Sequence, residues 1–167
     1  MAITIDSNLT EQKLLPNIYR LFELSAERIL SLEKNWRPSD GAPVFTVNGK
    51  YRSQGWTEWT QGFQFGSSLL QFDATADDRF LEIGRRHTVQ SMATHVSHMG
   101  VHDHGFNNIS TYGNLWRLMR EGKIAFSEPE NDFYELATAA QCRACRSVSS
   151  VLLPGSAGTR YYSVANG

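Results

Sequence analysis

The stretch His102-Asp103-His104-Gly105-Phe106 places one carboxylate between two imidazoles and follows them with a glycine and a large apolar ring. A histidine cation lowers the pKa of a nearby carboxyl group and an apolar wall raises it, so such an aspartate is a candidate for proton transfer. Glycine permits the sharp turn with which a loop presents a side chain to a cavity. The alternative is that the aspartate simply caps the helix that follows. The stretch alone leaves both interpretations open.

Two tryptophans, Trp56 and Trp59, lie three residues apart and therefore on about the same side of a predicted helix start. Packing at the edge of the core is the ordinary role of such residues. The functional alternative is a stacking platform, because the C–H face of a sugar ring lies well on an indole. A glycosidase cleft needs this platform together with a proton donor, which makes the two tryptophans and Asp103 candidates for one site.

The histidines allow a competing hypothesis. All five of them are His87, His95, His98, His102 and His104, and four fall within ten residues. Imidazoles with a carboxylate could bind zinc, so a metal-dependent hydrolase that uses the His95–His104 cluster is an alternative. The spacing fits no familiar ligand motif, and His95 and His98 lie at a predicted helix C-terminus, where the helix dipole alone favours a cation. We therefore predict no metal site and no cofactor.

Composition limits the partners. The apolar fraction of 41% is typical of a globular domain, and the net charge of −1 gives no reason to expect nucleic acid or an anionic membrane as partner. No apolar run is long enough to span a bilayer, and the N-terminus lacks the features of a secretory signal. We expect a cytoplasmic protein.

Two short sequence motifs are interpreted as structural rather than functional. Arg85-Arg86 is interpreted as a solvated helix face. The C-x-x-C pair of Cys142 and Cys145 has no second pair beside it and is interpreted as two reduced cysteines, with a redox pair or half a zinc site as the alternative.

Hydrophobic periodicity predicts a mostly helical chain. Asn48-Gly49 between Val44–Val47 and Lys50–Arg52 predicts a two-residue β-hairpin turn. Gly62 and Gly66, four residues apart, predict a helix face that another backbone approaches closely. Stacked helix pairs fit this order of elements better than an α/β fold. The predicted helices run from about Leu14 to Trp36 with Pro16 in the first turn, from about Thr57 to Phe72, from the opening Thr75–Asp78 to about Ser97, from Ile109 to near Gly122, and from Pro129 onwards.

The segments Gly55–Gly66 and His102–Phe106 together resemble the unsaturated glucuronyl hydrolases of glycoside hydrolase family 88. The shared motifs are tryptophan-threonine-x-glycine-phenylalanine, here Trp59–Phe63, and histidine-aspartate-x-glycine-phenylalanine, about one helix hairpin later. Tyr112-Gly113 and Arg117-Leu118 are similar to the next helix of the family. The resemblance covers roughly Leu14 to Gly167. His104 is a departure, since the family more often has an aliphatic or small residue there.

This resemblance implies an all-α fold, the (α/α)6 barrel, in which helix hairpins form a toroid around a central cleft. Residues 1–167 are then the N-terminal portion of one such domain, a partial barrel with a short β-hairpin. The implied substrate is an oligosaccharide whose non-reducing end is a 4,5-unsaturated uronic acid. An acid protonates the enol ether at C4, water adds at C5, and the resulting hemiketal opens and releases the sugar.

The resemblance also implies roles for single residues. Asp103 matches the first of two catalytic aspartates, Trp59 matches the tryptophan on which the unsaturated ring stacks, and His102 is expected to contact the substrate. The second aspartate, the proton donor, belongs to a later helix, and Arg160–Gly167 resembles the segment that leads into it. We therefore expect an apparently truncated chain, inactive alone, that can self-associate through its incomplete helical ring. The alternative is a carbohydrate-binding or assembly fragment.

Overall fold

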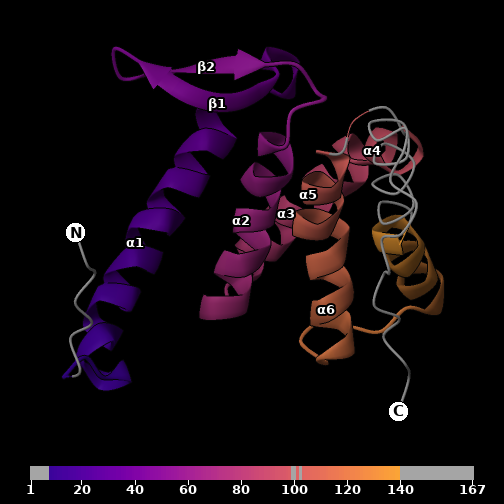
Figure 1. Ribbon diagram of the computed structural model, residues 1–167. Coiled ribbons are helices and arrows are strands. Elements are labelled where there is room, and N and C mark those ends of the chain that lie inside the picture. Colours follow the sequence, from indigo (N-terminus) through magenta and orange to yellow (C-terminus); the bar gives the residue numbers. More distant parts are fainter. Residues whose placement is uncertain (1–7, 99–100, 102, 140–167) are drawn as a thin grey trace, which may run out of the picture.

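The computed structural model describes residues 8–98, 101 and 103–139. These residues form a mostly helical domain with a two-stranded antiparallel hairpin at one end (Figure 1). The predicted fold class is confirmed to that extent, whereas closure into an (α/α)6 ring stays a prediction. His102, both cysteines and the segment 160–167 lie outside the described residues.

The first helix, α1 (Glu11–Asn35), begins earlier than its apolar pattern indicated. Thr10 caps it, with its hydroxyl oxygen accepting from the Lys13 N–H at 3.4 Å, and Glu11 places a negative charge in the first turn. The prediction that Pro16 lies in the first turn is therefore wrong. Only Ile29 of this helix is buried. The N-terminal half of α1 extends away from the other helices (Figure 1).

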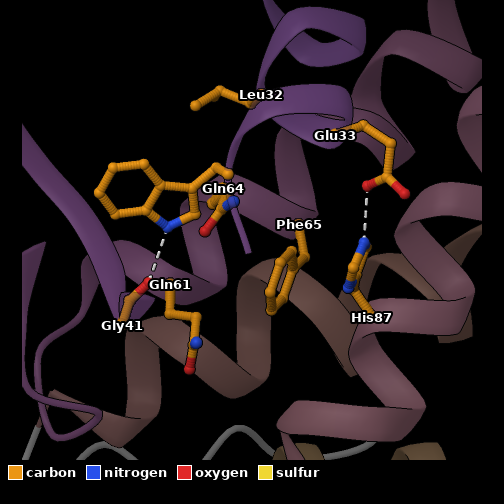
Figure 2. A pocket seen from close by; sticks show the side chains of 8 residues that line it. Leu32, Glu33, Gly41, Gln61, Gln64, Phe65 and His87 are labelled. Atoms are coloured by element: carbon orange, nitrogen blue, oxygen red, sulfur yellow. Dashed lines mark hydrogen bonds and ion pairs between the residues drawn. The ribbon is translucent and has the colours of Figure 1, made fainter. Parts of the chain in front are cut away.

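The C-terminal end of α1 is tied to its neighbours by polar contacts (Figure 2). The Glu33 carboxylate pairs with Arg86 and lies 2.7 Å from Nε2 of His87, both on the helix α3 (Asp78–Ser91). Trp36 donates its indole N–H to the Gly41 carbonyl at 2.9 Å. Burial acts to raise the pKa of Glu33, but the hydrogen bonds and charges of its two partners outweigh it and lower that pKa.

The replacement Glu33→Gln should lower the free energy of unfolding at pH 7 by about 1 kcal/mol, because the amide keeps the shape but loses two charge-assisted contacts. Urea unfolding measures this difference. Glu23→Gln is the control, since within the described part of the chain Glu23 pairs only with Arg20, on the exposed face of α1, and its loss should cost under about 0.5 kcal/mol. Equal effects of the two replacements would show that Glu33 does not hold α1 in place.

The hairpin consists of β1 (Ala42–Val47) and β2 (Lys50–Gln54), preceded by a single 3-10 turn, η1 (Pro38–Asp40). Asn48 and Gly49 both have positive φ, 51° and 72°, as a type I′ turn requires. The predicted hairpin is confirmed.

Helices α2 (Thr60–Thr75) and α3 (Asp78–Ser91) form a tight pair, and α2 packs more extensively against α3 than against any other described element. Asp77 caps α3 by accepting from the Arg79 N–H. The predicted third helix is interrupted at Met92, whose side chain is completely buried, and resumes as α4 (Ala93–Ser97).

The next helix has three consecutive parts, α5 (His104–Asn108), the π-helical η2 (Ile109–Gly113) and α6 (Asn114–Arg120). This helix starts before the predicted start at Ile109. The prediction placed the start too late because Asn107 and Asn108, which are buried in the structure, are polar residues typical of loops. A further helix begins at residue 128 and is described to residue 139.

The core lies among α2, α3 and the α5–α6 helix, with α1 contributing Ile29. Close helix packing depends on the two predicted glycines. A Cβ on Gly62 would lie 2.3 Å from Cα of Asn107, and one on Gly66 would lie 2.4 Å from the Ser110 carbonyl oxygen. The predicted close approach of another backbone is confirmed, and its partner is the α5–η2 segment. The largest completely buried apolar side chains are Leu69, Met92, Tyr112, Leu115, Leu118 and, at 2% exposure, Phe80.

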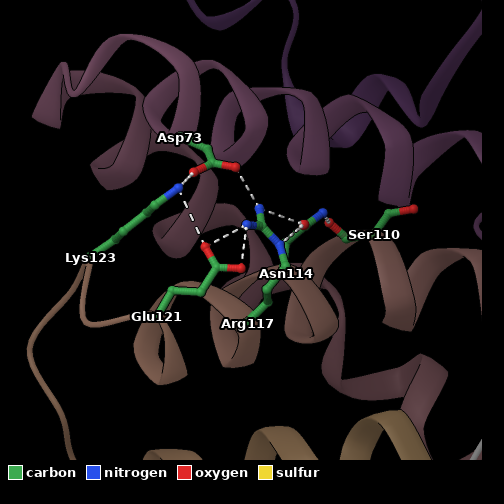
Figure 3. Close-up of polar contacts among 6 residues, drawn as sticks. All are labelled: Asp73, Ser110, Asn114, Arg117, Glu121 and Lys123. Atoms are coloured by element: carbon green, nitrogen blue, oxygen red, sulfur yellow. Dashed lines mark hydrogen bonds and ion pairs between the residues drawn. The ribbon is translucent and has the colours of Figure 1, made fainter.

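An ion-pair network joins α2 to the end of α6 (Figure 3). Arg117 bonds to Glu121 at 2.9 Å and to Asp73 at 2.8 Å, and Lys123 pairs with both carboxylates. Arg85-Arg86 likewise bridge helices, because Arg85 contacts Glu130 at 2.5 Å and Arg86 contacts α1. Arg86 is exposed and Arg85 partly so, which agrees with the interpretation as a solvated face, but both side chains also form ion pairs between helices.

None of the helices in the described part of the chain combines the length and apolar character that crossing a membrane requires.

Candidate functional site

The two motif segments, far apart in sequence, are joined by one buried amide. Oδ1 of Asn107 accepts from the Gly62 N–H at 2.7 Å, across 45 residues of sequence. Nδ2 of Asn107 donates to the Glu58 carbonyl at 3.0 Å. Asn107 is completely buried, so both contacts are shielded from water. The segment 58–62 is therefore fixed against the first turns of α5.

An aromatic platform, formed by Trp59, Phe63 and Phe106, lies where these segments meet. The Trp59 ring is 5.2 Å from Phe63 and 6.5 Å from Phe106, measured between centroids, and both contacts are edge-to-face. All three side chains are between 44% and 50% exposed, so they leave apolar ring surface open to a ligand. Their exposure and proximity make the platform a candidate binding surface.

Asp103 lies at the N-terminal end of α5, half-buried, in the turn that leads to Phe106. Its backbone is helical, with φ −64° and ψ −17°, and within the described residues its side chain makes no capping hydrogen bond to α5. The alternative interpretation of Asp103 as a helix cap is therefore wrong. Trp59 contacts Phe106, and Phe106 lies in α5, which begins directly after Asp103.

Trp56 and Trp59 have different neighbours, contrary to the prediction that they share one side of a helix start. The helix α2 begins only at Thr60, and Trp56 lies in the turn before it. The Trp56 indole stacks on His104, with centroids 5.4 Å apart and planes at 11°. It also meets the rings of His95 and His98 edge-to-face, at 5.5 and 5.2 Å. Trp56 therefore packs against the histidines, whereas Trp59 is part of the aromatic platform.

The histidine cluster, defined as His95, His98 and His104, is a continuous chain of imidazoles. Nδ1 of His95 is 2.7 Å from Nδ1 of His104, and Nε2 of His104 is 2.7 Å from Nδ1 of His98. His95 and His104 are completely buried, whereas His98 is exposed. His95 lies in the last turn of α4, which confirms its predicted position at a helix end, and it is also part of the buried interior.

Burial makes protonation of this cluster unfavourable. It lowers the pKa of His95 to about 4, and positive charge on His104 or His98 would lower it further. The pKa of His104 is also lowered, first by burial and then by His98, while the nearby Asp103 carboxylate acts in the opposite direction. At neutral pH these two rings are neutral.

Comparison of the chain with models of protein families, with curated proteins and with solved structures finds no match in any of the three. The resemblance to glycoside hydrolase family 88 therefore stays a prediction.

Sequence reasoning missed Asn107 and the role of Trp56. An asparagine within the apolar periodicity of a helix is a signal of a buried polar contact, because an unpaired amide is costly inside a protein. Nothing local indicates which backbone groups it meets. His102, predicted to contact substrate, lies outside the described residues.

The arrangement of the imidazoles differs from the one that a metal site requires. Nitrogens of neighbouring rings in the cluster face one another at hydrogen-bond distance, so their lone pairs do not converge on one point. Among the described residues, no group of three or more histidine, cysteine or acidic side chains is placed to hold a metal ion. The described geometry gives no support to the metal-dependent hydrolase.

Two cavities lie away from the aromatic platform. The one beside Glu33 and His87 has a volume of about 10 Å³, room for about one water molecule (Figure 2). A larger, mainly apolar one of about 290 Å³ lies between α3, η2 and the helix 128–139, and Tyr112, Phe133 and Tyr134 are among the residues that line it. Neither contains a residue of the predicted sugar site.

Proposed function

We propose that this chain carries the sugar-contacting part of an unsaturated glucuronyl hydrolase-like site. The observation that supports the proposal best is the contact of Trp59 with Phe106, which brings the exposed indole to the turn that begins with Asp103. A half-exposed indole offers a flat apolar face to a sugar ring, and a carboxylate can bind its hydroxyl groups. Both are needed at the non-reducing end of an oligosaccharide.

The proposed substrate is an oligosaccharide that ends in a 4,5-unsaturated uronic acid. Trp59 stacks on the unsaturated ring and Asp103 contacts it from α5, with His102 as a further expected contact. Hydration of the enol ether requires an acid that protonates C4 before water adds at C5. Asp103 corresponds to the supporting aspartate of the family rather than to this acid, and no residue of this chain is matched to the acid. We therefore propose binding without turnover by the chain alone.

The same proposal includes the ring. The α2–α3 pair and the α5–α6 helix that packs on α2 through Gly62 and Gly66 are proposed as parts of successive helix hairpins of an (α/α)6 barrel. Exposed apolar side chains on α1, among them Tyr19 and Leu21 at 64% and 61%, are proposed to contact further helices or a second copy of the chain.

Replacement of Trp59 should remove most sugar affinity. For Trp59→Ala we expect a loss of about 2 kcal/mol, roughly 30-fold in Kd, because the stacking surface disappears. Trp59→Phe should keep part of the affinity. The measurement is calorimetric or NMR titration with an unsaturated glucuronyl disaccharide. Tyr19→Ala is the matched control, an exposed aromatic residue on α1 whose loss should leave the affinity unchanged.

Two further measurements separate the alternatives. Incubation with the unsaturated disaccharide, followed by ultraviolet absorbance of the C4=C5 bond, should show no loss of signal; clear turnover would contradict the proposal of binding without chemistry. A disaccharide with a saturated uronic acid should bind more weakly. Equal affinity for both would favour a general carbohydrate-binding fragment, and a defined oligomer in solution would favour an assembly fragment.

A further inference from the structure

The histidine cluster has a direction, which follows from the chemistry of its rings. A neutral imidazole carries one N–H donor and one acceptor nitrogen. Because His104 bonds to a neighbour through each of its nitrogens, it must donate to one and accept from the other. The neutral chain can therefore run from His98 to His95 or from His95 to His98, and the imidazoles alone do not choose.

The contacts of Asn107 select one of these two directions of the hydrogen-bond chain. The Gly62 N–H can only donate and the Glu58 carbonyl can only accept, so these two contacts fix which end of the Asn107 amide is oxygen. Its NH₂ group is then the atom that lies 3.2 Å from Nδ1 of His95. A donor in that position requires an unprotonated Nδ1. His95 consequently accepts from His104, which accepts from His98.

We propose that Asn107 is the positioning residue of a proton relay that runs from the exposed His98 through His104 to the buried His95, and that the relay takes up a single proton, on His104. In the neutral state His98 and His104 carry their hydrogen on Nδ1 and His95 carries its own on Nε2. Within the described residues this last nitrogen is buried and has no hydrogen-bond partner, so the relay ends there.

Proton uptake can proceed without breaking the chain of rings. A proton that reaches Nε2 of the exposed His98 makes that ring a cation. Its Nδ1–H bond then breaks as this hydrogen passes to Nε2 of His104. His98 is left neutral, with its hydrogen on Nε2 and an acceptor at Nδ1. His104 becomes the cation and donates from both nitrogens, to His98 and to His95.

The surroundings of His104 favour one positive charge and oppose a second. The Trp56 indole stacks on its ring with centroids 5.4 Å apart, close enough for a cation–π contact with a protonated ring, and the Asp103 carboxylate acts on it from the preceding position. On the other side of the cluster, Asn107 connects it to the Glu58 carbonyl. Within the described residues, no charged side chain of the segment 58–62 forms a hydrogen bond with the cluster. A second proton, on His95 or His98, would set two N–H donors face to face at 2.7 Å.

The relay places a switchable charge beside Asp103, and its effect on sugar binding rests on the proposed function. With His104 neutral, Asp103 has no cationic ring in the cluster beside it. With His104 protonated, a positive charge lies close to the Asp103 side chain and changes the electrostatic environment of the proposed sugar site. The positions of the hydrogens, in contrast, can be measured without any sugar.

The test is a long-range ¹H–¹⁵N NMR spectrum of the imidazoles, recorded across pH 4 to 8 on the full chain. At pH 8 we expect protonated Nδ1 in His98 and His104 and protonated Nε2 in His95. The reverse order would overturn the relay, and so would a cluster that takes up two protons together. This measurement needs no variant, so it decides the question even where a replacement fails to fold.

Asn107→Asp supplies the matched change, since it keeps the shape and the acceptor for Gly62 but replaces the donor with a carboxylate. We expect a hydrogen on Nδ1 of His95 and a shift of the cluster titration to higher pH by about 1–3 units. Unchanged hydrogen positions in this variant would show that residue 107 does not set the direction of the chain of imidazoles. His98→Gln, at the exposed end, should slow proton exchange of His104 severalfold; an unchanged rate would contradict entry at His98. The two proposals fail separately: an unchanged sugar affinity of Trp59→Ala would contradict the sugar site alone, and the reverse order of hydrogens in the unaltered chain would contradict the relay alone.

Discussion

Gly62→Ala should destabilise the fold by about 3 kcal/mol or more, although alanine is the better helix former. A Cβ at this position would lie 2.3 Å from Cα and 2.9 Å from the carbonyl oxygen of Asn107, and neither is the end of a flexible side chain. The helices α2 and α5 must separate, and the Gly62–Asn107 hydrogen bond must lengthen with them. Urea unfolding followed by circular dichroism measures the loss.

Gly55→Ala is the matched control, because a Cβ there meets no atom within 4 Å. Its effect should be small, within about 0.5 kcal/mol, or slightly stabilising through the unfolded chain. If both variants unfold at the same urea concentration, the close contact of the two motif segments is wrong, and the geometry of the candidate site with it.

The free energy of unfolding should fall by about 3 kcal/mol as the pH decreases from 7 to 4. The pKa of His95 is 6.5 in the unfolded chain and about 4 in the folded one, and each unit corresponds to about 1.4 kcal/mol. Between these values the unfolded chain binds more protons than the folded chain, so stability rises with pH. The contribution is fully present above about pH 7 and is lost as the pH falls towards 4.

Urea unfolding at several pH values between 4.5 and 7.5 checks this slope, and His95→Gln should flatten it. Carboxyl groups with a lowered pKa, such as Glu33, also cost stability in acid, but only as the pH falls below the ordinary value of 4.5. The window above pH 4.5 therefore reports mainly on the buried histidines. An equal slope in His95→Gln would show that His95 is accessible to protons in the folded chain.

Several features of the site follow from residues close together in sequence. Asn48-Gly49 forms the predicted turn because both residues tolerate positive φ, which is a property of the residues themselves. Thr10 and Asp77 start their helices through contacts with N–H groups two or three residues away. Gly62 and Gly66 predicted that another backbone packs closely against them, but not that this backbone is the α5–η2 segment.

The residues that hold the site together were not predictable in this way. Trp56 and Trp59 were expected to act together, but α2 begins after both of them, and each ring packs where the tertiary structure leaves apolar surface for it. Asn107 and His104 were expected in a loop. A polar side chain is costly in a core unless it has hydrogen-bond partners, and the sequence alone does not show those partners.

The sequence by itself determined a mostly helical chain, its hairpin and its closely packed glycine face, because helix periodicity, turn conformation and side-chain size act over a few residues. Only the tertiary structure decided that Asn107 joins Gly62 to His95 and that Trp56 covers His104. Such hydrogen bonds and ring contacts depend on which distant backbone groups are left without a partner once the helices pack, and that is a property of the whole fold.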